Sequence, residues 1–117
     1  FFELFDTVTS VTGYARDEKT FQSYVDVFYD ELKEYHQLYD IYNDYEGINN
    51  IKTINDHAGI EPVEVDDKII QMLEEAVDIY ELTDGNMNVA MGSVLSIWHE
   101  YREAGLKHPE QRLAHHR

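Results

Sequence analysis

The residues whose types and spacing most favour ligand chemistry lie between Thr83 and Trp98. This stretch reads T-D-G-N-M-N-V-A-M-G-S-V-L-S-I-W and combines two amides, two methionines and two glycines. Glycine lets a ligand approach the backbone closely, and the N–H groups at a helix start near Gly92 and Ser93 form a potential anion site. We interpret the stretch as one side of a site for a flat, phosphorylated ligand. The alternative is an ordinary joint between two helices.

A second candidate is the polar stretch 38–55, which carries Tyr39, Tyr42 and Tyr45. A tyrosine ring can stack on a flat ligand. Loop tyrosines also close the edge of a core, and we expect that role for at least two of the three.

Recognisable catalytic and metal motifs are missing from these 117 residues. Asp44-Tyr45-Glu46-Gly47 approaches a calcium loop, but its glycine comes two positions early and Asn55 stands where such a loop needs Glu. The six histidines are scattered, and we expect His36 and His99 to be partly exposed helix residues. We therefore assign no catalytic residue and no metal ligand.

Composition narrows the function classes. The net charge of −15 repels phosphate backbones and anionic lipids, which argues against nucleic acid and membrane-surface binding. A phosphate-bearing ligand would need a metal ion or basic groups from elsewhere. The chain has no Cys, so thiolate sites and disulfides are excluded. It opens with Phe1 and no initiating Met, and we expect a truncated chain.

The N-terminal half contains the elements that would support these residues. Residues 1–15 are rich in β-branched and aromatic side chains, which favours a strand. A helix capped by Asp17 should run to about Tyr39, because apolar residues recur there every three or four positions. Residues 40–59 should be irregular, with one or two short helical turns, and residues 62–65 should form a short extended piece.

Two more helices should flank the ligand stretch. Asp66 should cap a helix over 67–82, with Gly85 as the left-handed residue after its end. The other helix should run from Ser93 to Ala104, with Gly105 beyond its end and Pro109 opposing regular structure after it. Its inward residues are predicted to be Leu95, Trp98 and Tyr101.

These segments follow one another in a fixed order: the N-terminal strand, the long helix, the tyrosine stretch 38–55, the helix over 67–82 and the stretch Thr83–Trp98. This order resembles the N-terminal portion of the FAD:protein FMN transferase family, also called the ApbE family. The resemblance runs from Phe5 to Arg102 and is strongest over Thr83–Trp98. It implies an α+β fold, in which the N-terminal strand or strands of a larger mixed sheet carry two to three packed amphipathic helices. It also implies that 1–117 is the N-terminal part of the domain, and that the C-terminal part with the Mg²⁺-binding residues is absent.

The resemblance implies a function as well. Family members use Mg²⁺ to cleave FAD and join FMN by a phosphoester to a Thr hydroxyl of an acceptor protein, typically a subunit of a membrane redox complex. Many are exported, membrane-anchored lipoproteins. By position, the FAD-contacting residues would be Tyr42, Asn86, Met87, Asn88 and Gly92.

This sequence departs from the family pattern at several positions. Asn88 replaces a usual Asp, Ser93 replaces a usual Pro, and Phe5-Asp6 replaces a common Met-Gly. Trp98 matches the closing aromatic of the block, and it is equally explained as a core anchor.

Because the metal-binding portion is expected to be missing, we expect this chain alone to be inactive. An alternative function is a non-enzymatic acidic module that binds a basic partner protein. A partial domain should also leave apolar surface uncovered, which favours self-association.

Overall fold

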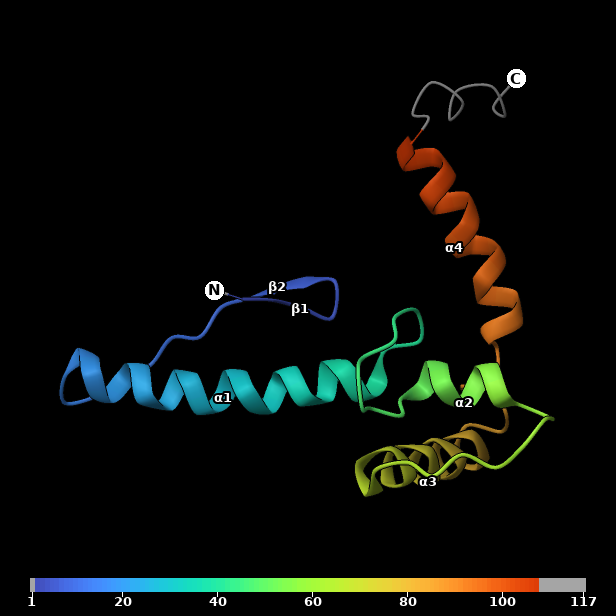
Figure 1. The fold of residues 1–117 in the computed structure, drawn as a ribbon, viewed down its shortest axis with the longest axis horizontal. Coiled ribbons are helices and arrows are strands. Elements are labelled where there is room, and N and C mark those ends of the chain that lie inside the picture. Colours follow the sequence, from blue (N-terminus) through green and yellow to red (C-terminus); the bar gives the residue numbers. More distant parts are fainter. Residues whose placement is uncertain (1, 108–117) are drawn as a thin grey trace. The chain divides into compact units, whose positions relative to one another are not determined.

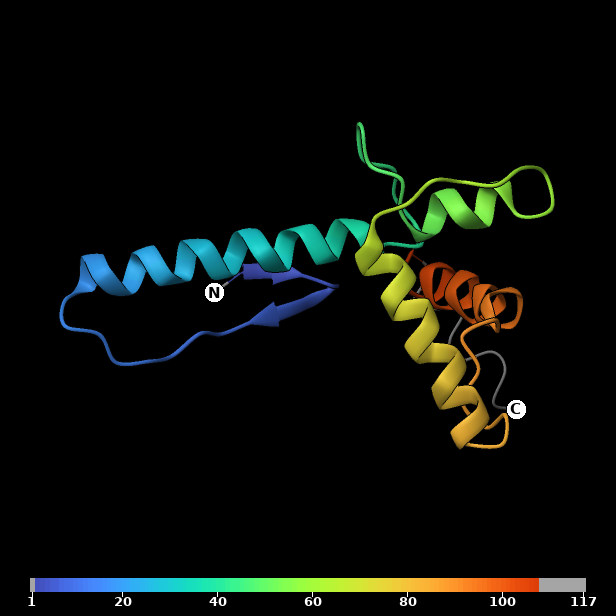
Figure 2. The ribbon, with the colours of Figure 1, turned by 90° about the horizontal axis from the view of Figure 1, so that it is seen from below.

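The computed structural model describes residues 2–107 (Figures 1 and 2). Its elements are β1 (Phe2–Leu4), β2 (Thr7–Thr9), α1 (Glu18–Tyr39), α2 (Ile51–His57), α3 (Asp67–Leu82) and α4 (Gly92–Lys107). The chain divides into two compact units, Phe1–Leu73 and Glu74–Arg117, whose boundary falls within α3. No helix within the described range is long and apolar enough to cross a membrane.

The N-terminal segment is a hairpin, so the prediction of one strand over 1–15 is wrong in extent. β1 and β2 pair antiparallel, with Leu4 opposite Thr7. Phe5 and Asp6 form the turn with φ of 55° and 54°, which is the left-handed backbone that a two-residue hairpin turn requires. No strand is assigned to residues 10–17.

Helix α1 confirms its prediction. The Asp17 side chain caps its start by accepting a hydrogen bond from the Thr20 N–H at 2.8 Å, which satisfies one of the unpaired donors of the first turn. The hairpin lies alongside α1 (Figures 1 and 2). Leu4 in β1 and Leu38 in α1 are both buried.

The short helix α2 confirms the helical turn expected within 40–59. Asn50 caps it: Asn50 Oδ1 accepts from the Thr53 N–H at 3.0 Å, and Thr53 Oγ1 accepts from the Asn50 N–H at 3.1 Å. Asn50 Nδ2 also donates to the carbonyls of Gln37 and Asn43. Asn50 is completely buried and thus joins α2 to the end of α1.

Helix α3 begins as predicted, with Asp66 Oδ1 accepting from the Lys68 N–H at 2.8 Å. Two contacts join its first turn to α1. Lys68 Nζ forms an ion pair with Glu34 at 2.7 Å, and the Tyr39 hydroxyl donates a hydrogen bond to the Lys68 carbonyl at 3.3 Å. Ile69 is fully buried beneath these contacts. Residues 62–65, predicted to be a short extended piece, have neither helix nor strand assigned.

In the second unit, the end of α3 and the presence of α4 are as predicted, but α4 is longer than predicted. Gly85 has φ of 80°, and its N–H donates to the Tyr80 carbonyl at 2.8 Å, as in a glycine-terminated helix. Helix α4 continues through Gly105 to Lys107, three residues past the predicted end. Helix propensity explains this, because a single glycine costs only about 1 kcal/mol relative to alanine. Pro109 lies outside the described residues.

The predicted inward face of α4 is a second correction. Leu95, Trp98 and Tyr101 are 56%, 71% and 72% exposed. The interpretation of Trp98 as a core anchor is therefore wrong for this structure, although the apolar spacing correctly marked one face of the helix. Uncovered apolar surface was expected of a partial domain.

The fold class is confirmed in part. The chain is mostly helical, with four helices and one two-stranded sheet among the described residues. This arrangement is compatible with part of an α+β fold. The larger mixed sheet that the resemblance implied does not appear within residues 2–107.

Candidate functional site

The loop between α3 and α4 is held in shape by its own polar groups. Thr83 is the centre: its carbonyl accepts from Asn86 Nδ2 at 2.8 Å, and its hydroxyl oxygen accepts from the Met87 N–H at 3.0 Å. Asn88 Oδ1 accepts from the Ala90 N–H at 2.8 Å. The two amide side chains predicted to contact a ligand therefore also set the backbone path of the loop.

Beside this loop lies a shallow apolar hollow of about 300 Å³ within the second unit. One wall is α3, through Ala76, Val77 and Tyr80, and the other is the loop segment Asn88–Ala90. Of the predicted site residues, Asn88 lines it. An apolar hollow bordered by a phenol ring and an amide suits the edge of a flat ring better than it suits a phosphate.

The predicted site residues are divided between the two units. Asn86, Met87 and Asn88 share the loop, and Gly92 begins α4. Tyr42 belongs to the first unit, where its N–H donates to Asp40 Oδ1 at 2.7 Å and the residue is 48% exposed. Their common role in binding FAD stays a prediction.

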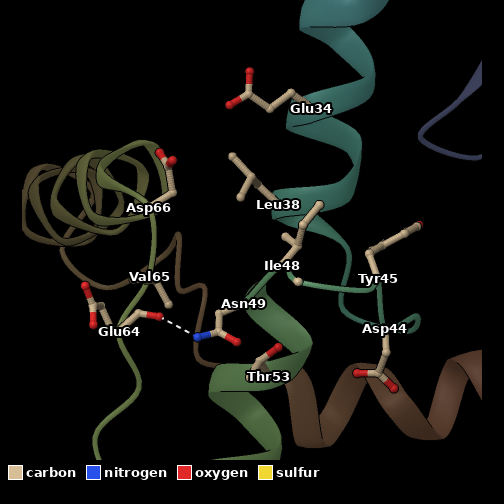
Figure 3. A pocket seen from close by; sticks show the side chains of 11 residues that line it. Glu34, Leu38, Asp44, Tyr45, Ile48, Asn49, Thr53, Glu64, Val65 and Asp66 are labelled. Carbon is tan, nitrogen blue, oxygen red and sulfur yellow. Dashed lines mark hydrogen bonds between the residues drawn. The ribbon is translucent and has the colours of Figure 1, made fainter.

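The first unit holds an open cleft of about 760 Å³, lined largely by the stretch 38–55 that was the second candidate in the sequence (Figure 3). Leu38, Ile48 and Val65 supply its apolar part (Figure 3). Asn49 Nδ2 spans its edge by donating to the Glu64 carbonyl at 2.7 Å. The acids at its rim are Glu34, Asp44, Glu64 and Asp66.

Two of these acids already have cationic partners. Lys68 pairs with Glu34 at 2.7 Å, and Lys52 pairs with Asp44 at 3.2 Å. A hydrogen bond to Asp56, followed by one to Asp44, raises the pKa of Lys52, and the hydrogen bond to Glu34 raises the pKa of Lys68. The rim is nonetheless negative, so the cleft is unsuited to a free phosphate group.

A polar network joins α1 to the loop that follows it. The Tyr45 hydroxyl donates to Asp40 Oδ2 at 2.7 Å and lies 3.3 Å from His36 Nε2. Asp40 also accepts from Asn43 Nδ2 and from the N–H groups of Tyr42 and Asn43. Partial burial raises the pKa of Asp40, but these hydrogen bonds outweigh it and lower that pKa to about 2. Burial, with the Asp40 hydrogen bond and charge, raises the pKa of Tyr45 to about 12.

Possible metal ligands are dispersed among the described residues. Nowhere in residues 2–107 do three or more His, Asp or Glu side chains come together as a metal site would require.

Sequence reasoning missed Asn50 and the His36–Tyr45–Asp40 network. Asn50 had a readable signal, because an Asn three residues before Thr53 and directly before an apolar residue is a form of capping box. The network had none, since nothing in the order of the residues shows that His36 meets Tyr45 and the hairpin.

Comparison with known proteins gives a family match. The model of the ApbE family matches residues 5–116, which is nearly the whole chain. No curated protein and no solved structure matches.

Proposed function

The chain belongs to the ApbE family, and we propose from this premise that it is part of an FAD:protein FMN transferase. The reaction would be a Mg²⁺-dependent transfer of FMN from FAD to a Thr hydroxyl of an acceptor protein, with formation of a phosphoester. The observation that carries the proposal is the family match over residues 5–116, which includes the whole loop between α3 and α4.

The loop offers chemistry suited to one part of FAD. The apolar hollow at Val77, Tyr80 and Val89 can cover a face or edge of a flat ring. Asn88 holds the turn through Oδ1, and its Nδ2 group is a donor for a ring heteroatom. The loop supplies no Lys or Arg for the pyrophosphate. A bound Mg²⁺ would supply that positive charge and stabilise charge developing on the phosphoryl group.

The partners follow from the same family inference. We propose that the acceptor is a protein with an exposed target Thr, and that it is a subunit of a membrane redox complex. We also propose that the parent protein is exported as a membrane-anchored lipoprotein. The strongly acidic surface supports the absence of a nucleic acid partner.

The proposal is tested with the protein made from the full reading frame that encodes this chain. It is incubated with FAD, Mg²⁺ and an acceptor that carries the target Thr, and covalent flavin fluorescence on the acceptor is measured after denaturing electrophoresis. We expect labelling that depends on Mg²⁺ and on the Thr hydroxyl. Under this proposal, residues 1–117 alone should give no transfer, so turnover by them would contradict that part of it.

A binding experiment separates this function from the alternative, a non-enzymatic module for a basic protein. FAD is titrated into wild type, Asn88→Ala and the control Asn88→Asp, which keeps the acceptor for the Ala90 N–H. Quenching of flavin fluorescence that weakens in Asn88→Ala or Tyr42→Ala supports the transferase. Indifference to FAD, with salt-sensitive binding to a basic protein, supports the module.

A further inference from the structure

The hydrogen bonds around His36 define which ring nitrogen carries the proton. The Phe5 N–H donates to His36 Nδ1 at 3.0 Å, so Nδ1 must be unprotonated. The Tyr45 hydroxyl donates its hydrogen to Asp40 Oδ2 at 2.7 Å. Its oxygen must then accept from His36 Nε2, 3.3 Å away. His36 is therefore the neutral imidazole with its proton on Nε2.

This ring is the polar link between the hairpin turn and the end of α1. The Phe5 ring meets it edge-on with a centroid distance of 5.4 Å, and the Tyr45 ring lies 6.2 Å away on the loop side. Leu4, which precedes Phe5 in the chain, is buried at 5% exposure. The position of the hairpin turn thus depends on an acceptor that a histidine loses when it takes up a second proton.

Several charged or titratable groups lie around His36. Asp40 and Tyr45 face it from the loop, Asp6 follows Phe5 in the hairpin turn, and Lys33 is one turn back on α1. With a pKa of about 2 for Asp40 and about 12 for Tyr45, neither changes charge between pH 5 and 8.

The two acids favour the loss of the acceptor, since a nearby negative charge favours the imidazolium. The Asp40 carboxylate, however, is already engaged by Tyr45, by Asn43 Nδ2 and by two backbone N–H groups. Asp6 is exposed to solvent in the turn, where water screens its charge.

We propose that His36 is a pH-sensitive latch for the N-terminal hairpin. In the neutral state, Nδ1 accepts from the Phe5 N–H and holds the hairpin turn against α1. When the imidazole takes up a proton at Nδ1, two N–H groups face each other, the Phe5 hydrogen bond breaks and the turn separates from the helix. The latch is closed while the imidazole is neutral and opens when it is protonated.

His57 provides an internal contrast. Its Nδ1 lies 2.8 Å from the Thr53 carbonyl, an acceptor, so Nδ1 carries a hydrogen in the neutral ring as well. Protonation adds a hydrogen at Nε2, which lies 3.7 Å from Glu61 Oε1. A proton on His57 therefore preserves its contacts, whereas a proton on His36 removes one.

The test is nuclear magnetic resonance of the full 117-residue chain labelled with ¹⁵N. At pH 8, long-range imidazole spectra should show His36 with hydrogen on Nε2 and His57 with hydrogen on Nδ1. Hydrogen exchange of the Phe5 amide, corrected for its intrinsic pH dependence, should speed up by roughly fivefold as His36 titrates, the worth of one net hydrogen bond.

Two variants complete the design. His36→Asn keeps an acceptor near the position of Nδ1 but cannot titrate, so the pH dependence of Phe5 exchange should vanish. His57→Gln removes the contrasting histidine and should leave that dependence intact. A His36 tautomer with hydrogen on Nδ1 at pH 8, or Phe5 exchange that does not change with His36 protonation in the wild type, would overturn the latch. These readouts are independent of FMN transfer.

Discussion

Replacing Asn50 with alanine should destabilise the unit Phe1–Leu73 more than any surface change of similar size. Asn50 is fully buried and makes four side-chain hydrogen bonds, two through Oδ1 within the cap of α2 and two through Nδ2 to carbonyls of the preceding segment. Its side chain therefore satisfies groups on α1, on the loop and on α2 at once.

The magnitude follows from these contacts. Loss of a helix cap costs about 1 kcal/mol. Each carbonyl that loses its donor adds about 1 kcal/mol, since a partly buried acceptor is left unpaired. The sum is about 3 kcal/mol, a large share of the stability of a small domain.

Hydrogen exchange measures this locally. The Lys52 N–H donates to the Asp40 carbonyl at 3.0 Å, and so reports directly on the attachment of α2. In Asn50→Ala its exchange should accelerate by about 100-fold, which corresponds to about 3 kcal/mol. Urea unfolding followed by circular dichroism should show a lower midpoint.

Two control variants locate the effect. Asn49→Ala removes one exposed hydrogen bond, to the Glu64 carbonyl, and should change Lys52 exchange by less than about fivefold. Asn50→Asp keeps the Oδ1 acceptor of the cap but removes the Nδ2 donor, and should still destabilise. If Asn50→Ala behaves like Asn49→Ala, or Asn50→Asp like wild type, the reasoning about the buried donor is wrong.

Three further predictions follow from single residues. The pKa of Asp40 is lowered to about 2, so its share of stability is present above its unfolded value of 3.8 and is lost as pH falls toward 2. Between pH 5 and 2, the free energy of unfolding measured with urea should fall by about 2 kcal/mol less in Asp40→Asn than in wild type. Stability profiles of the two proteins that run parallel over this pH range would contradict the prediction. Gly85→Ala should destabilise the second unit by about 1 kcal/mol, because φ is 80° and the new Cβ would lie 3.3 Å from the Tyr80 hydroxyl; an unchanged melting temperature would count against it. Trp98 is 71% exposed, so its fluorescence should resemble that of indole in water and be readily quenched by acrylamide, whereas a blue-shifted, protected emission would indicate a covered α4.

Long helices with a sustained apolar repeat were predictable from the sequence. Helix α1 has an apolar residue every three or four positions and Asp17 before its first turn, and both features act locally. The hairpin was missed because its turn is Phe5-Asp6, whereas the usual signal for such a turn is Asn-Gly or Asp-Gly. Local propensity therefore identified strand residues but not where the chain reverses.

Whether α4 is buried, and which residues meet at the site, depends on tertiary contacts. The spacing of apolar residues in the sequence does not show such contacts. Spacing identified Leu95 and Trp98 as one face, but whether another element covers that face is a tertiary property. In the same way, the loop with Asn86 and Asn88 was visible in the sequence as a polar, glycine-bounded stretch. The link from His36 to Phe5 spans 31 residues and has no local signature.

Covalent flavin transfer by the protein made from the full reading frame decides whether this chain is part of an FMN transferase. With FAD, Mg²⁺ and a Thr-bearing acceptor, we expect that the acceptor becomes fluorescent, gains the mass of one FMN group and stays unlabelled when its Thr is replaced by Ala. An acceptor that remains unlabelled with a folded protein, FAD and Mg²⁺ present, or labelling that is indifferent to the Thr, would contradict it.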